Sequence, residues 1–130
     1  MKISEKEIQA VSKLQPFDRY KYFIKRVADS ELMYSLKDED FNWLTSEIAG
    51  HIVLSFWSSK ELAQQCNTGD WKDYVIYEVT LEDFYGLLAP IIEQRNYLLN
   101  IFSVKSSESG FIVNLDEFKR DMRDELEKYS

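Results

Sequence analysis

The sequence predicts an α+β fold, in which a mainly antiparallel sheet of about five strands packs against helices, including N- and C-terminal helices. Three observations support this. Short alternating apolar runs are interspersed with helical apolar stripes, no strand–helix unit repeats regularly, and a polar loop with a glycine joins two runs near the C-terminal end as in a hairpin. The length of 130 residues suits a single globular domain over residues 1–130, with residues 1–28 as its helical N-terminal part.

Two helices are expected at the N-terminal end. Ser4 and Glu7 have the spacing of a capping box, which predicts a helix running to about residue 14. Pro16 interrupts it, and a second helix is expected over residues 17–28. Its apolar face contains Phe17, Tyr20, Ile24 and Val27. Its other positions carry Arg19, Lys21, Lys25 and Arg26, which we interpret as solvated surface rather than a phosphate or membrane patch.

The middle of the chain mixes strands with one short helix. Residues 31–36 and 74–79 have strand patterns, residues 51–57 (HIVLSFW) form the clearest strand, and residues 41–44 fit either a strand or an irregular segment. Residues 37–40 read as a charged turn. Ser58 and Glu61 form a second capping box, so a helix is expected over residues 59–66. Residues 67–69, which include a glycine, would end that helix.

The C-terminal third predicts two more helices around a hairpin. Thr80 is placed to cap a helix that kinks at Pro90. Residues 97–104 and 111–113 read as the hairpin strands, and Asn114 with Glu117 is expected to open the last helix. These patterns leave the order of the strands open.

Composition and charge exclude several classes of function. The net charge is −7, divided between +4 in residues 1–28 (7 basic, 3 acidic) and −11 in residues 29–130 (9 basic, 20 acidic). A nucleic-acid partner is not expected, because such binding needs clustered Lys and Arg. No apolar run is long enough for a membrane span, and the first residues lack the apolar core of a signal peptide. A single cysteine suits a reducing compartment, so we expect a cytoplasmic protein that does not bind membranes.

Catalytic and metal chemistry has little support in this sequence. His51 is the only histidine and Cys66 the only cysteine, and we interpret both as structural residues. One histidine and one cysteine do not make a zinc site, and the acidic residues 38–40 lack the spacing of a calcium loop. Glycine-rich phosphate loops are absent from the sequence. We therefore expect no catalytic, cofactor or metal site and no enzymatic activity.

The three tryptophans are candidates for core packing or for contacts with a partner. We expect Trp57 and Trp71 to be buried and Trp43, which follows the acidic turn, to be partly exposed.

One long segment, SFWSSKELAQQCNTGDWKDYVIYEVTLEDFYGLLAPIIEQ, carries a family resemblance. It resembles a small bacterial family named domain of unknown function 2750, in which an aromatic strand end is followed by a serine, an acidic residue, a Gly-x-Trp step and a Leu-x-x-Phe helix. The matching positions are Phe56, Trp57, Ser58, Glu61, Ala63, Gly69, Trp71, Leu81 and Phe84. The resemblance extends from about residue 17 to residue 126. It implies a stand-alone bacterial cytoplasmic protein with no known cofactor and no assigned activity.

Two functions stay open at this point. The first is a protein-binding module, such as an immunity-type antitoxin that neutralises a basic protein partner by charge complementarity. Its candidate contact residues are Asp38, Glu39, Asp40, Trp43 and Glu47. The alternative is a small-ligand-binding protein or an enzyme with a pocket that the sequence does not reveal.

Overall fold

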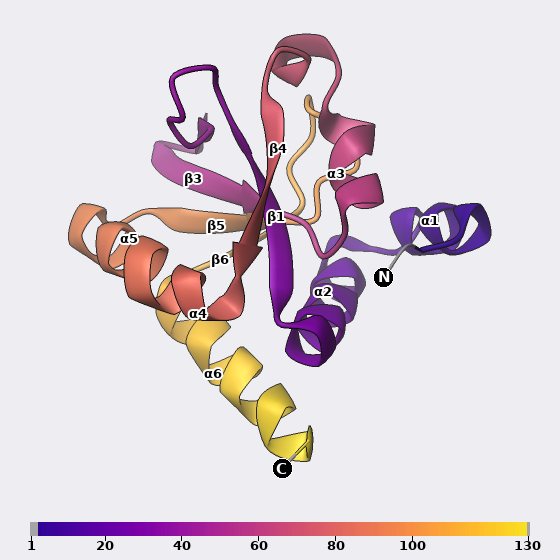
Figure 1. The fold of residues 1–130 in the computed structure, drawn as a ribbon, viewed down its shortest axis with the longest axis vertical. Coiled ribbons are helices and arrows are strands. Elements are labelled where there is room, and N and C mark those ends of the chain that lie inside the picture. The colour runs from indigo at the N-terminus through magenta and orange to yellow at the C-terminus, as the bar shows by residue number, and fades with distance from the viewer. Residues whose placement is uncertain (1–2, 130) are drawn as a thin grey trace.

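The computed structural model describes residues 3–129, whose elements form an α+β fold as predicted (Figure 1). The helices are α1 (Glu5–Ser12), α2 (Pro16–Ser30), α3 (Lys60–Cys66), α4 (Leu81–Asp83), α5 (Ala89–Arg95) and α6 (Leu115–Leu126). The strands are β1 (Leu32–Lys37), β2 (Thr45–Ile48), β3 (His51–Phe56), β4 (Val75–Thr80), β5 (Leu98–Ile101) and β6 (Phe111–Val113). Helices therefore stand first and last among the described elements, as expected.

The strands form two sheets. β1 and β4 make an antiparallel pair, and the other strands form a four-stranded sheet in the order β2-β3-β5-β6. Only the β3–β5 pair is parallel among residues 3–129, so the expectation of mainly antiparallel pairing is confirmed. The two sheets meet where the backbones of Tyr34 and Trp57 exchange two hydrogen bonds of 2.8 Å.

The described residues contain six strands, one more than the expected five or so. The additional strand is β2, whose sequence TSEI has a single apolar residue and therefore no alternating pattern to read. It pairs with β3 through a tight turn in which Ala49 and Gly50 both have positive φ, at 51° and 82°. Such turns match the twist of a hairpin, and a glycine adopts them without strain.

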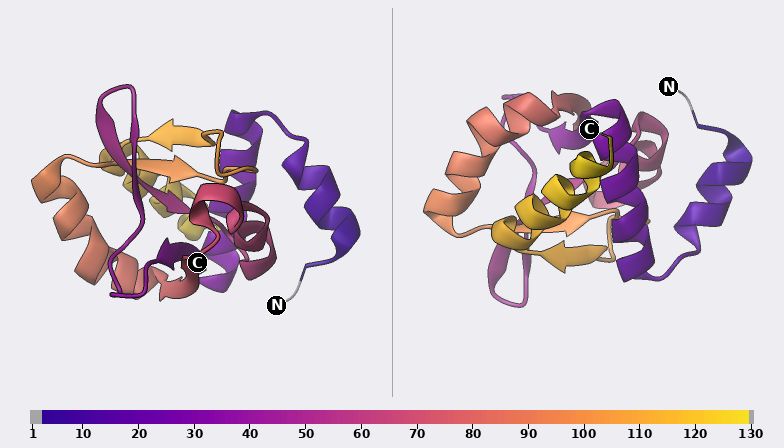
Figure 2. Two further views of the ribbon diagram at one scale, coloured as in Figure 1. Left: turned by 90° about the horizontal axis from the view of Figure 1, so that it is seen from above. Right: turned by 90° about the horizontal axis from the view of Figure 1, so that it is seen from below.

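The helices enclose a continuous hydrophobic core. α2 and α6 lie side by side against the four-stranded sheet, and α1 lies at the periphery (Figure 2). Trp57 and Trp71 are buried, as predicted, with their ring centroids 6.2 Å apart. None of the helices in residues 3–129 has the length and apolar character needed to cross a membrane.

Helix starts follow the predicted capping residues at three places and differ at one. The side chains of Ser4, Thr80 and Asn114 each accept a hydrogen bond from the N–H three residues later. The prediction that Ser58 caps α3 is wrong, because Ser59 accepts the bond from the Leu62 N–H. Either serine can serve as an N-cap, and the chain uses the second, although only Ser58 has an acidic residue three positions later.

The predicted interruption at Pro90 takes the form of a π-helical turn. Residues Phe84–Leu88 form this turn between α4 and α5, with the Ala89 N–H donating to the Phe84 carbonyl. Pro90 has no N–H to donate, and a π-turn shifts the hydrogen-bond pattern around such a position.

A buried polar network fixes the segment between β5 and β6. The Asn100 side chain donates to the hydroxyls of Ser55 (3.0 Å) and Ser103 (2.8 Å) and accepts from the Gly110 N–H (2.7 Å). Gly110 is required here, because a Cβ atom would lie 2.7 Å from the Phe102 carbonyl carbon. Satisfied polar groups of this kind fix one backbone arrangement in a core.

Candidate protein-binding face

The acidic turn between β1 and β2 is organised by Asp38. Its Oδ1 accepts hydrogen bonds from the N–H groups of Asp40 (2.9 Å) and Asn42 (3.0 Å). The bond from the Asn42 N–H, and to a smaller extent that from Asp40, holds the pKa of the Asp38 carboxyl below its usual value. Glu39 and Asp40 are exposed. Asp38 therefore shapes the turn, whereas Glu39 and Asp40 present free charge.

Aromatic rings surround the side chain of Lys37 directly beside this turn. Its ammonium lies 3.9 Å from the Tyr77 centroid, 4.2 Å from the Trp43 centroid and 5.8 Å from the Phe41 centroid. Trp43 and Tyr77 pack edge to face with their centroids 5.5 Å apart. Phe41 has a positive φ of 64° and is 72% exposed, so the turn projects its ring into solvent. Trp43 is partly buried, as predicted.

The apolar surface continues from these rings onto the helical segment that includes α5. Tyr77 and Trp43 line a hollow of about 200 Å³ together with Leu87 and Ile91. Leu87 and Ile91 are four residues apart and therefore share one helix face, next to the face of the buried Leu88 and Ile92. Leu87 is 66% exposed. Val75 is directly opposite Lys37 in the β1–β4 register and is also exposed.

We call this surface the aromatic face. It consists of Phe41, Trp43, Val75, Tyr77, Leu87 and Ile91. Five of its members are among the nine large apolar side chains that are exposed in residues 3–129. Isolated exposed apolar residues are ordinary, but a contiguous group of them is typical of a binding surface.

Carboxylates border the aromatic face. Glu78 and Asp83 line its hollow, and Glu39 and Asp40 adjoin Phe41 in the turn. Lys37 is the only cation among the described residues that line the hollow, and its ammonium makes no ion pair there. The border of the face is therefore acidic.

Glu47, the remaining candidate contact residue, lies away from this surface. It is an exposed residue of β2 and lines a different hollow, with Trp71, Asn100 and the loop residues 106–109. The structure thus brings together Asp38, Glu39, Asp40 and Trp43 but not Glu47.

The two residues considered for catalysis are in contrasting places. His51 is the exposed first residue of β3. Cys66 is fully buried and donates its S–H to the Ser103 carbonyl at 3.1 Å. Burial raises the pKa of the Cys66 thiol to about 12, so the thiol is protonated at neutral pH. Within residues 3–129, no group of three or more His, Cys, Asp and Glu side chains is arranged to hold a metal ion.

Sequence reasoning did not identify Tyr77, Leu87 or Ile91 as surface residues. Tyr77 lies in a sequence with a strand pattern, and Leu87 lies among the apolar residues of a predicted helix, so both resemble core positions. The spacing of Leu87 and Ile91, four residues apart and out of phase with Leu88 and Ile92, was the available signal.

Comparison with known proteins adds a family to this geometry. The family model described as protein of unknown function (DUF2750) matches residues 20–122. The chain belongs to this family. The DUF2750 match includes every residue of the aromatic face and the acidic turn, and it begins after α1. A search of curated proteins finds no match.

Proposed function

We propose that this DUF2750 protein is a protein-binding module whose aromatic face docks a basic protein partner. The observation that carries the proposal is the gathering of exposed rings and aliphatic side chains inside a border of carboxylates. An immunity-type antitoxin, which would neutralise a basic toxin by covering it in the cytoplasm, is the specific form that we propose.

The composition of the aromatic face suits a binding energy concentrated in few residues. Tyr and Trp are enriched in the centres of interfaces, because they bury a large area at a small entropic cost. Phe41 and Leu87, at 72% and 66% exposure, have most of their apolar area still to bury. Burying such area contributes roughly 25 cal/mol per Å² before the costs of association.

The acidic border suits a cationic partner. Glu39 and Asp40 are exposed at the end of a turn, where charges accelerate the encounter with a positively charged protein. The net charge of −7 adds a long-range attraction for the same positively charged protein. A partner's Lys or Arg side chains would then meet Glu78 and Asp83 at the edge of the hollow.

Action by contact rather than catalysis is part of the proposal. Cys66 is buried as a neutral thiol, and within residues 3–129 no hydrogen bond to the His51 side chain orients it. A general base or nucleophile normally needs such a partner.

The proposal is tested by affinity capture from the source organism with the tagged chain at low salt. A basic partner is expected with the native chain, with a loss of binding in the variant Phe41→Ala/Leu87→Ala and weaker binding at high salt. Leu14→Ala/Tyr129→Ala is the control, because it removes exposed apolar side chains outside the aromatic face. Equal capture by both double variants would refute docking through this face.

The antitoxin role has its own test. The captured partner should arrest growth when it is expressed alone and lose that effect when the native chain is expressed with it. The variant Glu39→Lys/Asp40→Lys should protect less well, since it reverses two border charges and leaves the turn-forming Asp38 in place. A partner that is harmless alone would exclude the antitoxin role but not the binding role.

A further inference from the structure

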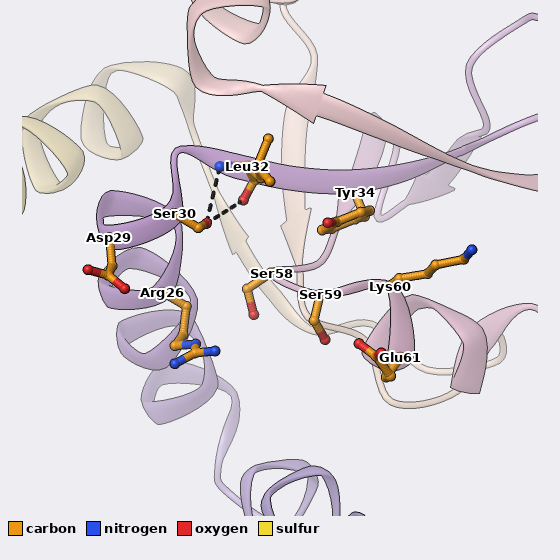
Figure 3. A pocket seen from close by; sticks show the side chains of 9 residues that line it. All are labelled: Arg26, Asp29, Ser30, Leu32, Tyr34, Ser58, Ser59, Lys60 and Glu61. Carbon is orange, nitrogen blue, oxygen red and sulfur yellow. Dashed lines mark hydrogen bonds between the residues drawn. The ribbon is translucent and has the colours of Figure 1, made fainter. Parts of the chain in front are cut away.

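A second hollow, of about 440 Å³, lies between α2, β1 and the start of α3, on different residues from the aromatic face (Figure 3). Arg26 contributes to it from α2, Tyr34 from β1, and Ser58, Ser59 and Glu61 from the start of α3. Its size suits a small metabolite.

Ser58 places an unused polar group in the wall of this hollow. Its hydroxyl oxygen is buried and has no hydrogen-bond partner among residues 3–129, and the residue is 9% exposed. In Figure 3 the hydroxyl points into the space that the Arg26 side chain also enters. A buried hydroxyl without a partner is costly, so it is uncommon in folded proteins unless a ligand or water satisfies it.

Arg26 is the second unused group. Its guanidinium, on a half-buried side chain, makes no hydrogen bond or ion pair with any residue in 3–129. Asp29, one helical turn later, also lines the hollow, but its carboxylate lies apart from the Arg26 guanidinium (Figure 3), and the two make no ion pair. An arginine presents five N–H donors in a planar fork that matches carboxylate and phosphate oxygens.

We propose that this hollow binds the phosphate or carboxylate group of a small metabolite, with Arg26 and the Ser58 hydroxyl as its donors. Ser59 adds a hydroxyl proton, because its oxygen accepts from the Leu62 N–H while its O–H is free to donate. Arg26 thereby acquires a role that distinguishes it from the exposed Lys21 and Lys25 on the same helix; Arg19, expected to be solvated, is instead buried and donates to the Leu14 carbonyl.

The remaining side chains restrict the ligand further. Glu61 lies at the edge of the hollow with its carboxylate on the side of Ser59 (Figure 3). A carboxylate repels a second anionic group and accepts hydrogen bonds, so the part of the ligand next to its anionic group carries hydroxyl or amino donors. A sugar phosphate and an amino acid are two classes with this combination.

The experiment uses the full chain with inorganic phosphate and acetate as probes. Thermal unfolding and amide NMR spectra are recorded at pH 7.5 with either salt, against sodium chloride at the same ionic strength. We expect a higher melting temperature with at least one probe, and amide shifts that cluster at residues 26–34 and 58–61. A response to phosphate alone assigns phosphoryl ligands, and a response to acetate alone assigns carboxylate ligands.

Three variants locate the effect. Arg26→Gln should weaken probe binding by about tenfold or more, because it removes the charged bidentate donor. Ser58→Ala should weaken it by a smaller factor. Lys25→Gln is the control, since it removes one positive charge from the adjacent position of α2, whose side chain lines a different hollow. No response to either probe, or an equal loss in Lys25→Gln, would overturn the proposal.

Discussion

The ammonium of Lys37 lies 3.9 Å from the centre of the Tyr77 ring and 4.2 Å from that of Trp43. Lys37 belongs to β1, Tyr77 to β4 and Trp43 to the segment before β2, so this contact joins three parts of the chain. It holds the aromatic face together, and within the described part of the chain no carboxylate pairs with the ammonium. A cation placed over ring faces is stabilised by their quadrupoles, most strongly when it is partly desolvated.

The substitution Lys37→Met should lower the free energy of unfolding by about 1 kcal/mol, because it keeps the aliphatic stem and removes the cation. Urea denaturation measures the change. Lys72→Met, at an exposed lysine whose ammonium makes no hydrogen bond or ion pair within residues 3–129, should change stability by less than about 0.5 kcal/mol. Equal effects of the two substitutions would show that the ring contacts do not stabilise the fold.

The substitution Asn100→Ala should destabilise the fold by about 2–4 kcal/mol, because the Gly110 N–H and the buried hydroxyls of Ser55 and Ser103 would lose a partner. Denaturant unfolding measures this loss as well. Asn114→Ala is the matched control, since it removes an exposed helix cap worth about 1 kcal/mol. A smaller effect at Asn100 than at Asn114 would contradict a structural role for the buried network.

Local sequence signals predicted much of the fold. Ser4, Thr80 and Asn114 were identified as caps because the capping bond spans only three residues, and the last helix followed from apolar residues at helical spacing. The parallel pairing of β3 with β5 was not predictable in this way. It joins Val53 with Leu98, 45 residues later, and no local pattern encodes such a register.

The candidate site was predictable only in its local part. The acidic turn and Trp43 are close in sequence and were identified together. Tyr77 and Leu87 reach the same surface only through the β1–β4 pairing and the π-helical turn. The hollow at Ser58 was missed because the capping pattern assigned that hydroxyl to a helix N–H, whereas Ser59 makes the bond.

The substitution Ser58→Ala should raise the free energy of unfolding by up to about 1 kcal/mol in the absence of ligand, because it removes a buried hydroxyl that has no partner. Ser59→Ala should lower it by about 1 kcal/mol, because it removes the cap of α3. Thermal and urea unfolding of the two variants in phosphate-free buffer measure both changes in the free energy of unfolding. A loss of stability in Ser58→Ala would mean that its hydroxyl is satisfied in solution.

The buried thiol of Cys66 predicts a stability that declines at alkaline pH. Burial raises its pKa from an unfolded value near 9.0 to about 12 in the folded chain, so the folded state binds this proton more tightly. The corresponding stability is complete below pH 9 and is lost between about pH 9 and 12, with a slope of at most about 1.4 kcal/mol per pH unit. Burial and hydrogen bonds to Asp121 and Glu7 raise the pKa values of Tyr20 and Tyr22, which adds a decline of the same sign at higher pH.

Urea unfolding of the native chain and of Cys66→Ala at pH 7, 9 and 10 separates these contributions. The native chain should lose stability between pH 9 and 10, and Cys66→Ala should lose less over the same interval, because the contribution of the buried thiol is absent. Modification by a disulfide reagent at pH 8 should be slow in the folded native chain and fast in denaturant, since the thiol is inaccessible until the core opens. Rapid modification of the folded chain would show that Cys66 reaches solvent, and the alkaline decline would then need another source.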